Sequence, residues 1–141
     1  MLRLLLSLAL FGASSACTCV PRTPKQIFCL SQWVAVFEIG DSTSFDIYLT
    51  YQATPITVYK VQSSFGTPQV GVPTLLHTFN QSSLCGVRNL QKGHLYLLSG
   101  YYDNKQQMRM STCALFNPWL WSSVSQAVKN ALANGSYLPC P

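Results

Sequence analysis

Six cysteines, all placed after residue 16, constrain the fold of this 141-residue chain more than any other feature of its sequence. An even number of cysteines in a small secreted chain predicts disulfides, here three, although the sequence alone permits fifteen pairings. Three of them fall within residues 17–29 and the others are spread to the end, so pairing early with late would fasten the amino-terminal segment at three points. The six are Cys17, Cys19, Cys29, Cys85, Cys113 and Cys140.

A zinc site is the weaker interpretation of these cysteines. The single residue between Cys17 and Cys19 is fewer than the two to four that usually separate zinc ligands. No second close pair of cysteines or histidines complements them. We therefore expect the cysteines to be structural.

Residues 1–16 have the three parts of a secretory signal peptide. Met1-Leu2-Arg3 is positively charged, residues 4–11 are apolar, and residues 12–16 are small. The sequence predicts cleavage after Ala16, with Ser14 at the minus-three position. An acylated lipoprotein cysteine is the alternative, but its signal usually carries Leu where Ser14 stands. The mature chain would be secreted and would begin at Cys17 with a free α-amino group.

The predicted mature chain, residues 17–141, has the size of one domain. It contains no run of about 20 apolar residues, so we expect no membrane insertion. Only 9% of the whole chain is charged. Without Arg3, eight Lys and Arg stand against four Asp and Glu, and the basic residues are scattered, which excludes a nucleic-acid patch. Weak binding to acidic polysaccharide of the extracellular matrix stays open, and we expect a monomer.

Sequence periodicity predicts mainly β structure. Five strands with no βαβ alternation favour a closed antiparallel barrel of the five-stranded Greek-key kind. Pro55 interrupts the longest strand and predicts an edge position or a bulge. Residues 103–105 form the expected turn between the last two strands. The predicted strands are Trp33–Ile39, Ser44–Val61 (with Phe45, Ile47, Leu49 and Tyr51 on one face), Thr74–Phe79, Leu95–Tyr102 and Gln107–Thr112.

Two helices are expected to flank this barrel. Thr23-Pro24 is a good start for a short helix that reaches Ser31. An apolar stripe at helical spacing runs from Val124 to Leu132. Ser123 and Gln126 match a capping box, and Asn134-Gly135 is a good stop. No repeat or linker divides the chain.

An enzyme is the poorest fit to the sequence. The histidines are His77 and His94, and His77 lies in a strand-like run where a core or edge role is expected. The acidic residues show no paired spacing for acid–base catalysis, and no phosphate loop or nucleophile motif is present. These acidic residues are Glu38, Asp41, Asp46 and Asp103.

Several segments, in the right order, resemble the tissue inhibitors of metalloproteinases along the whole predicted mature chain. The resemblance begins at the amino terminus and continues through the later cysteines. The matching segments are Cys17-Thr18-Cys19-Val20-Pro21, Phe28-Cys29, Ser83-Leu84-Cys85-Gly86, Tyr96-Leu97-Leu98-Ser99-Gly100, Thr112-Cys113 and Pro118-Trp119.

This resemblance implies a netrin-like version of the oligonucleotide/oligosaccharide-binding barrel. The disulfides it implies are Cys17–Cys85, Cys19–Cys113 and Cys29–Cys140. The chain ends after Cys140 and Pro141, so we expect it to lack the second, six-cysteine subdomain of the vertebrate members.

The resemblance also implies a mode of inhibition. The amino group and carbonyl oxygen of Cys17 would chelate the catalytic zinc of a secreted or membrane-anchored metalloproteinase, with no cofactor of the chain's own. Thr18 would enter the primed-side pocket. Cys19, Val20 and Pro21 would continue the inhibitory ridge, and the Cys17–Cys85 bond would bring a second segment, Ser82, Ser83 and Leu84, to the non-primed side.

Two features qualify this interpretation. Asn80 and Asn134 each begin an N-glycosylation sequon, and Arg22 places a charge directly after Pro21. The alternative function is a non-inhibitory secreted netrin-like module that binds extracellular matrix or a signalling partner. Such modules usually lie inside longer chains, where no free α-amino group exists, so the predicted cleavage before Cys17 favours inhibition.

Overall fold

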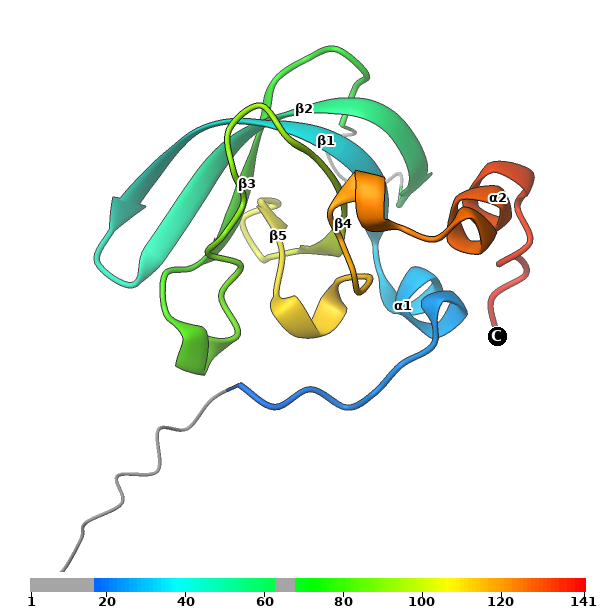
Figure 1. The fold of residues 1–141 in the computed structure, drawn as a ribbon. Helices are drawn as coiled ribbons and strands as arrows, with labels where there is room; N and C mark the ends of the chain where they lie inside the picture. Colours follow the sequence, from blue (N-terminus) through cyan, green and yellow to red (C-terminus); the bar gives the residue numbers. More distant parts are fainter. Residues whose placement is uncertain (1–16, 63–67) are drawn as a thin grey trace, which may run out of the picture.

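The computed structural model describes residues 17–62 and 68–141 (Figure 1). The predicted signal peptide, residues 1–16, lies outside the described residues. Helix α1 (Pro24–Leu30) is followed by strands β1 (Trp33–Phe45), β2 (Tyr48–Val61), β3 (Thr74–Phe79), β4 (Leu95–Tyr102) and β5 (Met108–Arg109). Helix α2 (Gln126–Asn134) comes near the carboxyl end. Three short 3-10 helices, η1 (Ser82–Leu84), η2 (Thr112–Ala114) and η3 (Trp121–Ser123), complete the fold.

The five strands close into a barrel in the order β1-β2-β3-β5-β4, which confirms the predicted five-stranded ring. The expectation of an entirely antiparallel barrel was wrong in one place, because β3 and β5 pair in parallel through Leu76–Met108 and His77–Arg109. The reason is geometric. Strand direction cannot alternate all the way round a ring with an odd number of strands, so one neighbouring pair must run the same way.

The β1–β2 hairpin lies where the sequence predicted continuous strand. The chain reverses at Asp46, which has a left-handed φ of 55°. Phe45 therefore ends β1 and is 83% exposed, whereas Leu49 is buried inside the barrel. The expected break after Ile39 is a register shift between Ile39 and Ser42, across which β1 continues.

Pro55 lies at a bulge, as its residue type predicted. It is opposite Phe37 of β1, and the next register pair is Val36 with Thr57, so Ile56 is the extra residue. Proline has no N–H to donate to a strand ladder, and a bulge tolerates that loss. The bend lets this long strand curve around the barrel.

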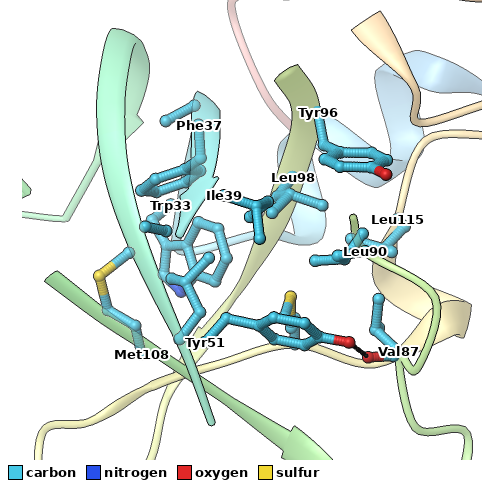
Figure 2. Packing of buried hydrophobic residues seen from close by; sticks show 14 of the residues in the cluster. Trp33, Phe37, Ile39, Tyr51, Val87, Leu90, Tyr96, Leu98, Met108 and Leu115 are labelled. Carbon is cyan, nitrogen blue, oxygen red and sulfur yellow. Dashed lines mark hydrogen bonds between the residues drawn. The ribbon is translucent and has the colours of Figure 1, made fainter. Parts of the chain in front are cut away.

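Two apolar layers hold the structure together. The barrel interior contains Trp33 and Phe37 packed edge to face, with ring centroids 5.8 Å apart (Figure 2). The hydroxyl of Tyr51 crosses this core and donates to the carbonyl of Val87 at 2.8 Å. The second layer lies between the barrel and the helices, where Val34 and Val36 of β1 meet the buried residues of α1 and α2. Both faces of β1 are thus covered, which explains its weak polar–apolar alternation.

Helix α1 begins where the sequence predicted, and helix α2 begins later in the chain than predicted. The Thr23 hydroxyl accepts from the Gln26 N–H at 3.2 Å and caps α1. In α2 the cap is Ser125, which accepts from Val128, and not the predicted Ser123. Ser123 belongs instead to η3, which shifts the helix start past Val124. The helix ends at Asn134 with Gly135 in a left-handed conformation, as the sequence predicted.

The predicted strand over residues 107–112 is only two residues long. Asp103 organises the turn before it: its carboxylate accepts from the N–H groups of Lys105 and Gln107 and binds the Arg109 guanidinium at 2.7 Å. After β5, Ser111 caps η2. Side-chain caps at both ends thus limit the strand to Met108–Arg109.

Candidate functional site

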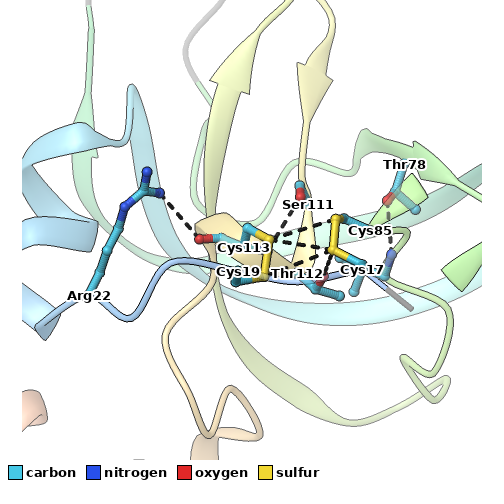
Figure 3. Close-up of a disulfide and its surroundings, with 9 residues drawn as sticks. Cys17, Cys19, Arg22, Thr78, Cys85, Ser111, Thr112 and Cys113 are labelled. Carbon is cyan, nitrogen blue, oxygen red and sulfur yellow. Dashed lines mark hydrogen bonds between the residues drawn. A yellow bond between two sulfur atoms is a disulfide. The ribbon is translucent and has the colours of Figure 1, made fainter. Parts of the chain in front are cut away.

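The amino-terminal segment is fastened by two adjacent disulfides. Cys17 bonds to Cys85 and Cys19 to Cys113, each with Cα atoms 5.1 Å apart. Figure 3 shows that the two bonds lie against each other, with the sulfurs of Cys17 and Cys113 3.5 Å apart. The third disulfide, Cys29–Cys140, joins the end of α1 to the tail after α2. These are the three pairs that the resemblance implied.

The sulfur cluster is not a zinc site. The sulfurs of Cys17, Cys19 and Cys113 lie within 4.8 Å of one another, a separation that suits a metal. Each is bonded to another sulfur, however, and a cysteine side chain binds a metal as the free thiolate. The cluster serves to stiffen the chain.

Residues 17–21 form an extended strip along one end of the barrel (Figure 1). Thr18, Val20 and Pro21 are exposed, with Val20 at 74%. Arg22 follows, and its guanidinium donates to the Cys113 carbonyl at 3.5 Å (Figure 3). The strip is thus fixed at Cys17, Cys19 and Arg22, while the side chains between them face solvent.

The second predicted segment, Ser82–Leu84, is the exposed helix η1. The Gln81 carbonyl accepts from the N–H groups of Leu84 and Gly86, at 3.2 and 3.1 Å. Cys85 then takes a left-handed φ of 59° and bonds to Cys17. The structure therefore brings the two predicted halves together at one end of the barrel.

Gly86 allows this turn to sit close to β3. A Cβ atom at Gly86 would lie 1.9 Å from the Phe79 carbonyl oxygen, far inside van der Waals contact. On its other side, the Cys85 carbonyl accepts from the Thr112 N–H at 2.9 Å. Backbone contacts thus hold η1 in place in addition to the disulfide.

A pocket of about 300 Å³ opens beside Cys17, and the sequence reasoning did not anticipate it. Arg88 stands in its wall and donates to the Ser82 hydroxyl at 3.1 Å. The sequence offered a signal for it, since the residues after Cys85 must approach Cys17 as closely as those before it. The lining residues are Cys17, Ser82, Gly86, Val87, Arg88, Asn89, Thr112 and Trp119.

The two sequons differ in position. Asn80 follows β3 and is half-buried, and its N–H donates to the Ile47 carbonyl at 2.6 Å. Its sequon ends at Ser82, within η1. Asn134 is exposed at the end of α2, and its side-chain oxygen accepts from the Ser136 N–H at 2.9 Å.

The two histidines of the chain lie away from the strip and η1. His77 of β3 is half-buried, with Nδ1 3.2 Å from the Thr50 hydroxyl. Burial, followed by the positive charge of Arg109, lowers the pKa of His77, and the charge of Asp103 partly opposes this shift. His94 is exposed and stacks on Tyr96. Neither histidine lines the pocket beside Cys17.

The sequence of the chain matches a known family over nearly its whole length. The family model described as tissue inhibitor of metalloproteinase matches residues 15–140. The chain belongs to this family. Metalloproteinase inhibitor 2 of Cavia porcellus is 28% identical over 155 aligned residues, which cover 99% of the chain and 66% of that relative. The chain thus spans about two thirds of the length of this curated relative.

This family member has two exposed segments, residues 17–21 and η1, joined by a disulfide at one end of a closed barrel. Within the described ranges 17–62 and 68–141, no helix is long and apolar enough to cross a membrane.

Proposed function

We propose that the chain is a secreted inhibitor of zinc metalloproteinases that acts through the end of the barrel formed by Cys17, Thr18 and η1. Family membership supports inhibition over catalysis. The observation that carries the proposal is the attachment of Cys17, since its disulfide to Cys85 places it next to exposed η1 and holds it there.

The proposed chemistry needs only the main chain of Cys17. After cleavage behind Ala16, the α-amino nitrogen and the carbonyl oxygen of Cys17 form a bidentate ligand that closes a five-membered ring on a metal. A catalytic zinc with three protein ligands keeps a position for water, which this pair would displace. The chain supplies no cofactor of its own.

Coordination by the amine depends on its protonation. Only the neutral amine has a lone pair to donate, and an ordinary α-amino group titrates at about 7.7–8.0. Binding therefore releases a proton near physiological pH.

The disulfides prepare the strip for binding. Ordering a flexible segment at an interface costs about 0.5–1.5 kcal/mol for each immobilised side chain, and prior rigidity lowers that cost. Cys17 and Cys19 are each anchored, so the intervening Thr18 has little freedom left. We assign its exposed side chain to the primed-side pocket of the protease, with Val20 and Pro21 continuing along that side.

We assign η1 to the non-primed side. Ser82, Ser83 and Leu84 are all exposed, Leu84 at 41%, and they flank Cys17 through Cys85. A glycan on Asn80 would stand directly before this helix, so the inhibitor should be tested both with the sugar and after its enzymatic removal.

The decisive test compares the refolded mature chain with a variant that has one extra Ala before Cys17. The added residue converts the amine into an amide and leaves the fold unchanged, so inhibition of a panel of matrix and membrane-anchored metalloproteinases should be lost. Thr18→Gly is the companion variant, and we expect it to weaken inhibition of the enzymes with deep primed-side pockets. Equal inhibition by the extended and mature chains would refute chelation. Inhibition by neither chain would favour the non-inhibitory module that binds matrix or a signalling partner.

A further inference from the structure

We propose that the pocket between Cys17, Ser82 and Arg88 receives an acidic side chain from the non-primed rim of the protease, so that Arg88 selects metalloproteinases with acidic rims. This inference rests on the proposed inhibitory function and names a partner property that the family match does not give.

The position of Arg88 is the first observation. It lines the same pocket of about 300 Å³ as Cys17, and its Nη1 donates to the Ser82 hydroxyl at 3.1 Å. A guanidinium has five N–H donors, and this contact uses one of them. The residue is exposed, so donors outside this contact are accessible to a partner bound at this surface.

The chemistry of the pocket is the second observation. Its lining contains the hydroxyls of Ser82 and Thr112 and the amide of Asn89, and no carboxylate. These groups are neutral, so Arg88 carries the charged side chain among the lining residues. The ligand that this set favours is an anion, and the planar guanidinium fork matches a carboxylate in particular.

The distribution of charge on the molecule is the third observation. In residues 17–62 and 68–141 the ion pairs are Lys92–Asp41 and Arg109–Asp103, each 2.7 Å long. Neither pair involves Arg88. The remaining side-chain carboxylates are Glu38 in β1 and Asp46 in the turn between β1 and β2. Arg88 thus keeps an unneutralised charge beside the proposed binding segment.

A charge at this place acts on both affinity and rate. A rim charge mainly changes the association rate and its salt dependence, whereas a charge pair that becomes enclosed also slows dissociation. A protease side chain that enters the pocket would lie against lining residues such as Cys17 and Trp119 and be partly enclosed, so we expect both effects.

The test uses one protease catalytic domain in two forms, one with its native acidic non-primed rim and one with those carboxylates replaced by amides. The inhibitor variants are Arg88→Ala, Arg88→Lys and Arg88→Glu in the mature full chain. Lys105→Ala is the matched control, because it removes the same charge from the β4–β5 turn, which lines a different pocket. Inhibition constants and association rates are measured at ionic strengths of about 0.05 and 0.5 M.

On the acidic-rim domain we expect about tenfold weaker inhibition for Arg88→Ala and on the order of 100-fold for Arg88→Glu. Arg88→Lys should fall between Arg88→Ala and the unmodified chain, because it keeps the charge and loses the fork. On the amide-rim domain all three should inhibit like the parent, and Lys105→Ala should match the parent on both.

Equal losses on both domains would show that Arg88 only positions η1 through Ser82, and unchanged constants would show that it makes no contact. Either result overturns the inference while leaving chelation intact, provided the extra-Ala variant is inactive. If the unmodified chain inhibits neither domain, the proposed function fails and this inference fails with it.

Discussion

Gly86 shows how a single residue sets the position of the proposed inhibitory surface. Its hydrogen atom faces the Phe79 carbonyl oxygen, where a Cβ would lie at 1.9 Å. Because the clashing oxygen belongs to the main chain of Phe79, no change of rotamer could relieve the clash with a Cβ atom at residue 86. Helix η1 and Cys85, which precede Gly86 directly, would have to move.

We therefore predict that Gly86→Ala lowers the free energy of unfolding by about 3 kcal/mol and weakens inhibition as well. Chemical unfolding and inhibition constants measure the two effects. Gly71→Ala is the control, since Gly71 has a φ of 81° and a Cβ there would meet no atom within 4 Å. Its cost should be about 1–2 kcal/mol, from backbone strain alone, with inhibition unchanged. Equal effects of the two substitutions on inhibition would contradict this account.

At the level of single residues, the sequence predicted positions correctly where a disulfide determines which residues lie close together. The resemblance gave the pairing of Cys17 with Cys85, and the pairing placed Ser82–Leu84 beside the terminus. Arg88 was counted only among scattered cations, because its place three residues after Cys85 indicates closeness to Cys17 but does not indicate a pocket. Its pocket depends on Thr112 and Trp119, which come from distant parts of the chain.

At the scale of elements, β3 and β5 carry the most sensitive electrostatic feature of the barrel. His77 is half-buried there, next to Arg109, and both its burial and that positive charge lower its pKa in the folded chain. In the unfolded chain a histidine titrates near 6.5. The unfolded state therefore binds the proton more readily than the folded state does.

It follows that the stability contributed by neutral His77 is complete above pH about 6.5 and is lost as the pH falls through the lower pKa of the folded state. Urea unfolding of the chain should show a decline in stability as the pH falls below about 6.5, and His77→Gln should flatten that decline. His94→Gln, at an exposed position, is the control and should keep the slope of the parent. Identical slopes for His77→Gln and the parent would contradict the prediction. Asp103 does not contribute to this pH range, because its pKa in the folded chain lies below 3.8. Burial raises the pKa of Asp103, but the hydrogen bonds from Arg109, Gln107 and Lys105 outweigh burial and lower it.

The elements that sequence predicted well are those with local signals. Helix α1 has its cap in Thr23 and its first-turn proline in Pro24, and β3 and β4 match their predicted bounds. The β1–β2 hairpin was missed because its turn at Asp46 lacks the glycine or asparagine that usually marks one. The short β5 was overestimated because its ends depend on Asp103 and Ser111, whose capping contacts periodicity does not reveal.

The disulfides divide the described part of the molecule into the proposed binding end and a supporting end. Cys17–Cys85 and Cys19–Cys113 lie at the proposed binding end, whereas Cys29–Cys140 joins α1 to the tail after α2. All three close long loops, of 68 to 111 residues in sequence separation. The supporting end also contains the apolar layer of Phe28 and Leu132.

This division predicts different phenotypes for two double variants. Cys29→Ser with Cys140→Ser should lower the free energy of unfolding by about 2–4 kcal/mol and leave inhibition constants unchanged in the folded protein. Cys19→Ser with Cys113→Ser should cost a similar free energy and also weaken inhibition, because it releases Thr18. Calorimetry and inhibition assays below both melting temperatures distinguish the two. Equal loss of inhibition in both variants would mean that the ends are not independent.

The sequence predicted the closed ring of five strands, because five strand-like segments occur without βαβ alternation. That at least one neighbouring pair must be parallel follows from the odd number of strands, but that this pair is β3–β5 depends on the order of strands around the ring. The packing of α2 could not be predicted, because its register depends on η3, which has no periodic signal.

Binding of a protease metal by the main chain of Cys17 can be measured on a protease catalytic domain with cobalt(II) in place of zinc. The visible spectrum of cobalt reports its ligands. Addition of the mature chain should change the absorption bands, because a nitrogen and an oxygen of Cys17 replace bound water, and the chain with one extra Ala should leave the bands unchanged. Inhibition by the mature chain with an unaltered cobalt spectrum would contradict the account.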